Sequence, residues 1–229
     1  MKRFLVVVLA VFCAATVFAQ EKGNSSFRVS LGGGGSLAGN FSTWSLDKDI
    51  PGDLHRYDST QLGAGPFLFF DLKFLELSIG FPLGTLEADD TISMSANDNF
   101  PAQTYGLRGS AYLKLPFTVS PMFSLFPLLG IDYDLYLLAQ KKDERDAKFP
   151  VSATNQTAKA SDALNALWFK AGVGLDTFFG DNLFIRTEIF YGIRLANEME
   201  NYLKDVRKDD FNWMLPHGGD FKIAIGYRF

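Results

Sequence analysis

Cysteine and histidine are almost absent from this chain of 229 residues. The only cysteine is Cys13, and the only histidines are His55 and His217. Neither histidine stands in a recognisable catalytic spacing, and the sequence has no zinc or EF-hand pattern and no phosphate-binding glycine loop. We therefore expect no disulfide, no metal, no cofactor and no enzymatic activity.

Long hydrophobic runs are missing as well. After the first 20 residues no window is an uninterrupted apolar stretch of helix length, although 47% of the residues are hydrophobic and 23 are phenylalanine. The 22 basic and 26 acidic residues nearly balance, and no basic stripe with interleaved aromatics indicates nucleic-acid binding. A membrane protein without hydrophobic helices must span as a closed β-barrel, because unpaired backbone groups are too costly in hydrocarbon.

The N-terminus has the pattern of a secretory signal peptide. Residues 1–3 are basic at two positions, residues 4–12 form an apolar run, and residues 17–19 fit a cleavage site with small residues at its key positions. A membrane anchor is the alternative, but the run is shorter than the ~20 residues that a spanning helix needs. We predict that residues 1–19 are a cleaved signal peptide and that residues 20–229 are the mature domain. Cleavage would leave a mature chain without cysteine.

Period-two alternation of apolar residues predicts eight strands in the mature chain. Each is long enough for the ~9 to 11 residues of a tilted transmembrane strand, and their number is even, as in bacterial barrels. The predicted ranges are about 26–37, 60–70, 73–84, 104–116, 122–136, 164–178, 183–195 and 221–229. Pro66, Pro82 and Pro127 fall inside three of these strands, where each would remove a ladder donor, so they predict bulges or displaced boundaries.

The last predicted strand shows the alternation most clearly. Successive side chains of a strand point to opposite faces. One face would carry Phe221, Ile223, Ile225, Tyr227 and Phe229, and the other would carry Lys222, Ala224, Gly226 and Arg228. The chain ends on the aromatic residue of the apolar face.

The connections between the predicted strands alternate in length. Tight turns are expected near residues 71–72, 118–120 and 180–182, and long connections over about 38–59, 85–103, 138–163 and 196–219. Short periplasmic turns and four long extracellular loops are typical of an outer-membrane barrel. The long connections carry acidic residues in excess, which indicates solvated loops.

The face opposite the apolar one carries most of the charge of the predicted strands. Its charged residues, which would face the barrel lumen, are Arg28, Glu76, Arg108, Lys114, Asp132, Asp134, Lys170, Asp176, Arg186, Glu188, Arg194, Lys222 and Arg228. Buried charges are costly unless they are paired. The sequence therefore leaves two interpretations: a salt-bridged plug that conducts little, or a narrow polar path with a slight preference for anions.

A soluble periplasmic barrel would show the same alternation with the apolar row inside. The interior of an eight-stranded barrel is only just wide enough for its side chains, and the apolar row supplies too many large residues to fit there. The glycine-rich opposite row also suits a crowded lumen better than a solvated surface.

The whole mature chain resembles the small eight-stranded outer-membrane proteins of the OmpW, OmpX and OmpA-barrel kind. The resemblance rests on the signal peptide, the strand count, the alternating connections and a C-terminal segment similar to the β-signal of such proteins, with Phe221, Ile223, Ile225, Tyr227 and Phe229 at its positions. It implies an all-β transmembrane barrel in the outer membrane of a diderm bacterium, inserted by the barrel assembly machinery. The size is closest to the OmpW family, which is associated with passage of small hydrophobic molecules.

Two functions follow as expectations. The protein would be either a narrow passive conduit, or a plugged barrel that displays acidic loops for adhesion or for contact with a host or the envelope. The sequence names no small-molecule or host ligand.

Overall fold

The computed structural model of the chain describes residues 29–46, 56–90, 102–140, 148–150, 157–159, 164–197, 211–213 and 216–229. The predicted signal peptide and Arg28 lie outside the described residues. The strands are β1 (Ser30–Leu46), β2 (Arg56–Asp71), β3 (Leu75–Gly80), β4 (Leu83–Asp90), β5 (Ala102–Lys114), β6 (Phe117–Ser120), β7 (Phe123–Gln140), β8 (Lys148–Pro150), β9 (Thr157–Lys159), β10 (Ala166–Phe179), β11 (Leu183–Asn197), β12 (Phe211–Trp213) and β13 (His217–Arg228). The described residues include no helix that is both long and apolar enough to cross a membrane.

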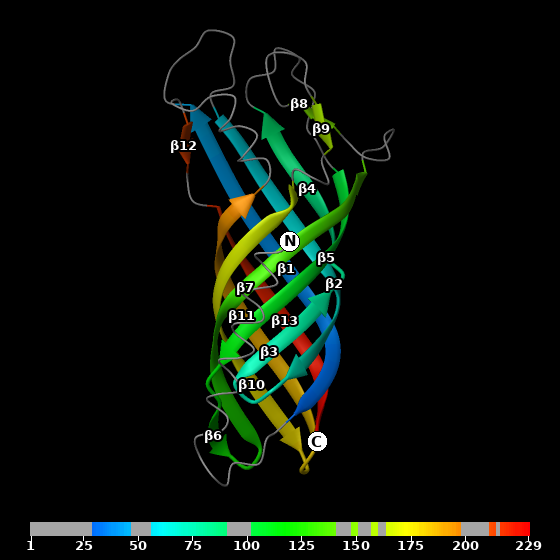
Figure 1. Cartoon of the computed structure of the whole chain (residues 1–229), viewed down its shortest axis with the longest axis vertical. Helices are drawn as coiled ribbons and strands as arrows, with labels where there is room; N and C mark the ends of the chain where they lie inside the picture. Colours follow the sequence, from blue (N-terminus) through cyan, green and yellow to red (C-terminus); the bar gives the residue numbers. More distant parts are fainter. Residues whose placement is uncertain are drawn as a thin grey trace, which may run out of the picture.

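These segments form a closed antiparallel barrel of eight tilted strand positions (Figure 1). Closure is seen at β1, which pairs with β2 on one side and with β13 on the other. Two of the eight positions each consist of two consecutive strands with a break between them. One position is formed by β3 and β4, and the other by β5 and β6. β12 extends the barrel beyond β13 by pairing with the end of β1. The predicted eight-stranded antiparallel barrel is therefore confirmed.

The two ends of the barrel differ. At one end, here called the turn end, short connections run through residues 72–74, 121–122 and 180–182, and the amide of Phe229 donates to the carbonyl of Val29 at 2.9 Å. Gly180 adopts a positive φ of 77°, which glycine reaches without steric cost. At the opposite end, here called the loop end, lie the ends of β1, β4, β7 and β11. The turn expected at 118–120 was misplaced, since those residues belong to β6 and the chain reverses at residues 121–122.

The strands reach further toward the loop end than predicted. Residues 38–46 and 56–59 were expected in a loop, but residues 38–45 of β1 pair with residues 56–63 of β2. β4, β7 and β13 also extend into predicted loops. Beyond the membrane the outward row has no lipid to face, so polar residues occupy both rows and the period of two disappears while the hydrogen-bonded ladder continues.

Each of the two prolines inside a strand lies opposite a break in the neighbouring strand. Pro66 lies in β2 opposite the break between β3 and β4, which Pro82 occupies. Pro127 lies in β7 opposite the break between β5 and β6 at residues 115–116. No register shift occurs at either in-strand proline, so the expected bulges are wrong there.

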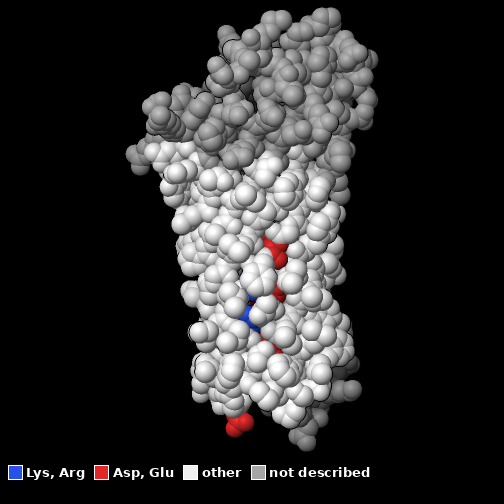
Figure 2. Space-filling view, turned by 180° about the vertical axis from the view of Figure 1, so that it is seen from behind, with Lys and Arg blue, Asp and Glu red and all other residues white. Residues whose placement is uncertain are grey.

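Large apolar side chains cover the outer wall of the barrel. The outward row of β13 runs from Phe221 to Phe229 at alternate positions, and all five of its side chains are exposed. Figure 2 shows a wall almost free of Lys, Arg, Asp and Glu on the face in view, apart from a narrow strip of acidic and basic side chains and an acidic side chain at the turn end. The soluble interpretation is therefore wrong, because it would bury this row. Near the turn before β3 the outward row is interrupted, since Leu75 is buried and Phe74 is exposed.

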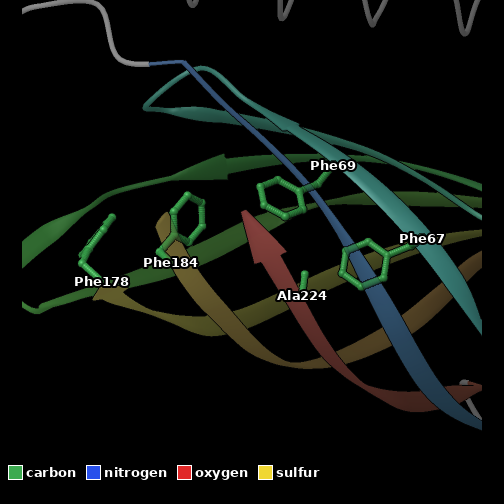
Figure 3. Packing of buried hydrophobic residues seen from close by; sticks show 5 residues of the cluster. All are labelled: Phe67, Phe69, Phe178, Phe184 and Ala224. Atoms are coloured by element: carbon green, nitrogen blue, oxygen red, sulfur yellow. The ribbon is translucent and has the colours of Figure 1, made fainter. Parts of the chain in front are cut away.

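Aromatic rings fill much of the interior. Phe67 and Phe69 of β2, Phe178 of β10 and Phe184 of β11 point inward and pack near Ala224 of β13 (Figure 3). Phe69 and Phe178 each contact Phe184, with ring centroids 6.2 and 5.4 Å apart. These rings share the inward row with the charged residues, so the interior is packed with both.

Candidate functional site: the charged interior

Twelve charged side chains are buried among the described residues. Charged residues are rarely buried in proteins unless they are paired. Five are cations and seven are acids: Arg108, Lys114, Lys170, Arg186 and Lys222, and Asp71, Glu76, Asp132, Asp134, Asp176, Glu188 and Asp220. They come from seven of the eight strand positions, and ten of them form two networks.

The Arg186 network lies toward the turn end. The guanidinium of Arg186 donates to Glu76 at 2.6 Å, to Asp71 at 2.6 Å and to both carboxylate oxygens of Asp176 at 2.7 and 2.8 Å. Lys114 donates to Asp71 as well. The same guanidinium packs against three phenylalanine rings, with its central carbon 4.5 to 5.2 Å from their centroids. One cation therefore joins carboxylates of three strands across the lumen.

The Arg108 network lies next along the lumen. Arg108 binds Asp134 through two nitrogens, at 2.5 and 3.0 Å, and reaches Asp220 at 3.1 Å. Lys170 lies 2.7 Å from Asp132 and also donates to Asp220. The hydroxyl of Tyr112 donates to Asp132. This network joins β5, β7, β10 and β13.

Lys222 and Glu188 lie between the two networks without joining either by a hydrogen bond. They face each other across β13 and β11 in the ladder. The ammonium of Lys222 has no hydrogen-bond acceptor and rests over the rings of Phe67, Tyr112 and Phe190, at 4.7 to 5.4 Å. Neither carboxylate oxygen of Glu188 accepts a hydrogen bond, and Oε1 lies 3.9 Å from Nε of Arg186.

The remaining predicted lumen residues lie closer to the two ends. Arg194 is half-buried, with its guanidinium 6.0 Å from the ring of Trp168, and Arg228 is half-buried over Phe178 at 4.0 Å. Sequence reasoning missed Asp71 and Asp220, because Asp71 was placed in a turn and Asp220 just outside the last strand. With both included, acids outnumber cations among the buried residues, so the cation excess that suggested a preference for anions does not hold.

Neutral polar side chains line the interior on the loop-end side of Arg108. Asn40, Ser42, Thr104 and Tyr136 are buried, and Gln61 donates to the hydroxyl of Tyr136 at 2.5 Å. A cavity of about 10 Å³ lies among Asn40, Gln61, Thr104, Tyr136 and Arg108, which is room for roughly one water molecule. Within the described segments, no three His, Cys, Asp or Glu side chains are grouped so that they could hold a metal ion.

The closed barrel, the apolar outer wall and the packed charged interior define the class of protein. Only a lipid environment makes an exposed apolar wall and an inward charged row favourable together. The protein is a small transmembrane β-barrel of the kind that bacterial outer membranes contain.

Comparisons with known proteins find similar barrels among solved structures. No protein-family model and no curated protein matches the chain. Among solved structures, the outer membrane protein OprG from Pseudomonas aeruginosa is 12% identical, with 90% of this chain and 98% of OprG covered and a TM-score of 0.48. Neisserial surface protein A is 11% identical, with 91% and 100% covered and a TM-score of 0.40. Ail, the attachment invasion locus protein of Yersinia pestis, is 14% identical, with 86% and 99% covered and a TM-score of 0.36. At these identities the likenesses say nothing of function.

Proposed function

We propose that this protein is an outer-membrane barrel with a closed lumen that acts at the cell surface through its loop end. The observation that carries the proposal is the continuity of the two networks and the aromatic rings, which together fill the lumen from the turn end to Arg108. A solute would have to break several buried ion pairs to pass, and each buried pair costs about 3 to 5 kcal/mol when one partner is removed.

The height of the apolar wall supports membrane embedding. Along β1 the exposed outward positions run from Leu31 to Phe41. Ten residue steps at about 3.3 Å, tilted by about 40°, rise about 25 Å, the height of the apolar band of an outer-membrane barrel. The strands beyond Phe41 then project from the membrane and hold the loop end above it. Export by a cleaved signal peptide and insertion by the assembly machinery belong to the same proposal.

The protein acts without catalysis in this proposal. His217 lies between the rings of Phe41 and Tyr191 at 6.0 and 6.1 Å, a setting that suits the membrane interface, and His55 lies outside the described residues. A nucleophile with an oriented base is missing from the described interior.

The second candidate is a narrow conduit. Lys222 and Glu188 favour it, because these two charged groups share no hydrogen bond and leave polar atoms between the networks without partners. A conduit would use this polar row as its path.

Planar-bilayer recording separates the two candidates. The closed barrel predicts no stable conductance for the native protein and channel openings for the Arg108→Ala, Arg186→Ala double variant, because both central guanidiniums are lost. Gln140→Ala, an exposed position at the loop end, is the control and should stay silent. Steady conductance of the native protein would overturn the closed lumen in favour of the conduit.

A further inference from the structure

We propose that Glu76 and Glu188 share one proton at neutral pH, and that loss of this proton at alkaline pH opens the lumen. The shared proton is a property of the interior alone. The opening rests on the proposed function, because only a closed lumen can open.

The two carboxyl groups meet across the lumen. Glu76 belongs to β3 and Glu188 to β11, and these strands lie four positions apart around the barrel of eight. Both side chains are fully buried, and they are in hydrogen-bonding contact with each other. Two carboxylates cannot donate to one another, and two buried like charges in contact repel strongly. One proton held between them removes the repulsion and supplies the missing donor.

The partners of each oxygen atom indicate which residue carries the proton. Oε2 of Glu76 accepts a hydrogen bond from Arg186 at 2.6 Å, whereas Oε1 of Glu76 has no donor. Neither oxygen of Glu188 has a hydrogen-bond partner. A protonated Glu188 that donates to Oε1 of Glu76 satisfies both groups, because a carboxylic acid has one O–H donor. Glu188 is therefore the acid of the pair, and Glu76 is the carboxylate.

The cations around the pair offer Glu188 no hydrogen bond. Nε of Arg186 lies 3.9 Å from Oε1 of Glu188, which is too far for one. Lys222 faces Glu188 in the ladder, but its ammonium has no hydrogen-bond acceptor and rests over three aromatic rings. The other charged side chains around Arg186 pair with one another: Lys114 donates to Asp71, and Arg186 donates to both Asp71 and Asp176.

The position of the pair connects its proton to closure of the lumen. The hydrogen bond from Glu188 to Glu76 joins opposite walls of the barrel, beside Arg186 and next to the Arg108 network. Without the proton, two negative charges face each other there, and their repulsion is stronger in a low-dielectric interior than in water. We expect the two side chains to separate and water to enter between them, so alkaline pH should open a path through the lumen.

Infrared spectroscopy of the protein in lipid vesicles tests the proton directly, because the C=O stretch of a protonated carboxyl group is distinct from the bands of a carboxylate. The native protein should show this stretch at neutral pH and lose it at alkaline pH. Glu188→Gln and Glu76→Gln should each abolish it, since either change leaves one carboxyl group without a like charge beside it. Asp181→Asn, which removes an exposed carboxyl group at the turn end, is the control and should keep it. Folding of each variant is checked by its heat-dependent shift on gels.

The shared proton would be overturned if the native protein lacked this stretch at neutral pH, or if the stretch survived in either glutamine variant. Planar-bilayer recording tests the opening. The native protein should conduct only above the pH at which the stretch disappears, and Glu188→Gln, which cannot become charged, should stay closed over the same range. Equal alkaline opening of both proteins, or none in the native protein, would overturn the role of the pair in opening. Conductance of the native protein at neutral pH would instead contradict the closed lumen, and the infrared result would still decide whether the proton is shared.

Discussion

Arg186 and Glu188 stand two residues apart on β11 and are both buried, yet their surroundings differ sharply. Arg186 satisfies three carboxylates, whereas Glu188 accepts no hydrogen bond and faces Lys222 across the ladder. Removing Arg186 leaves several charges without a partner in a low-dielectric interior, whereas neutralising Glu188 breaks no hydrogen bond.

Arg186→Met should therefore lower the free energy of unfolding by about 3 to 5 kcal/mol, because Asp71, Glu76 and Asp176 lose their shared cation. Glu188→Gln is the matched control on the same strand and should leave the unfolding midpoint unchanged or raise it slightly, since no hydrogen bond is lost. The measurement is denaturant unfolding in lipid vesicles. Equal destabilisation by both variants would mean that the pairing of Arg186 is not what holds the interior together.

The sequence predicted which strand residues are charged and opposite the apolar row, because a period of two assigns faces without knowledge of partners. It could not predict that Arg108 and Arg186 are the centres of separate networks, since each network includes contacts between residues more than 100 positions apart, as between Arg186 and Glu76 or Arg108 and Asp220. Asp71 and Asp220 were missed because they lie at strand ends, where alternation gives way to turn or loop composition.

At the scale of the strand, inward-facing glycines leave space that aromatic rings of the neighbouring strand fill. The ring of Phe126 lies against Gly174, that of Phe184 against Gly226 and that of Tyr112 against Gly130. Each pair lies on adjacent strands, so the ring fills space that a side chain would otherwise occupy. The glycine-rich inward row indicated crowding from the sequence, but the rings that cause the crowding could be identified only in the structure.

Gly174→Ala should destabilise the barrel by about 1 to 3 kcal/mol, because the new methyl group overlaps the ring of Phe126 and forces a shift in a packed interior. Gly35→Ala on β1 is the matched control, since a side chain there would meet no atom within 4 Å. Thermal unfolding followed by circular dichroism compares the two variants. If Gly35→Ala lost as much stability as Gly174→Ala, the cause would be the change in backbone freedom and not the overlap with the ring.

At the scale of the whole molecule, the barrel closes where its ends meet. β1 and β13 pair over residues 30–41, and Phe229 extends this contact to Val29. Strand number, antiparallel order and outer face followed from the sequence because each depends on local alternation. Strand lengths did not, because the ladder continues beyond the membrane, where the hydrophobic signal ends.

Phe229→Ser should impair assembly in the cell far more than stability. The side chain of Phe229 is 71% exposed, so its contribution is no more than about 1.5 to 3 kcal/mol even when lipid covers it. We expect periplasmic accumulation and degradation of the variant in the native host, with normal refolding in detergent micelles. Normal surface levels of the variant would contradict the assignment of residues 221–229 as a β-signal.

The central claim, a lipid-facing wall around a closed interior, is tested most directly by two neighbouring cysteine substitutions in a Cys13→Ser background. Ile225 faces outward and is 62% exposed, whereas Ala224 is 3% exposed inside the barrel. In lipid vesicles, Ile225→Cys should react with a membrane-soluble maleimide but not with a charged, water-soluble one, and Ala224→Cys should react with neither until the protein is unfolded. Rapid reaction of Ala224→Cys with the water-soluble reagent would show an open aqueous lumen, and rapid reaction of Ile225→Cys with it would show that the wall does not face lipid.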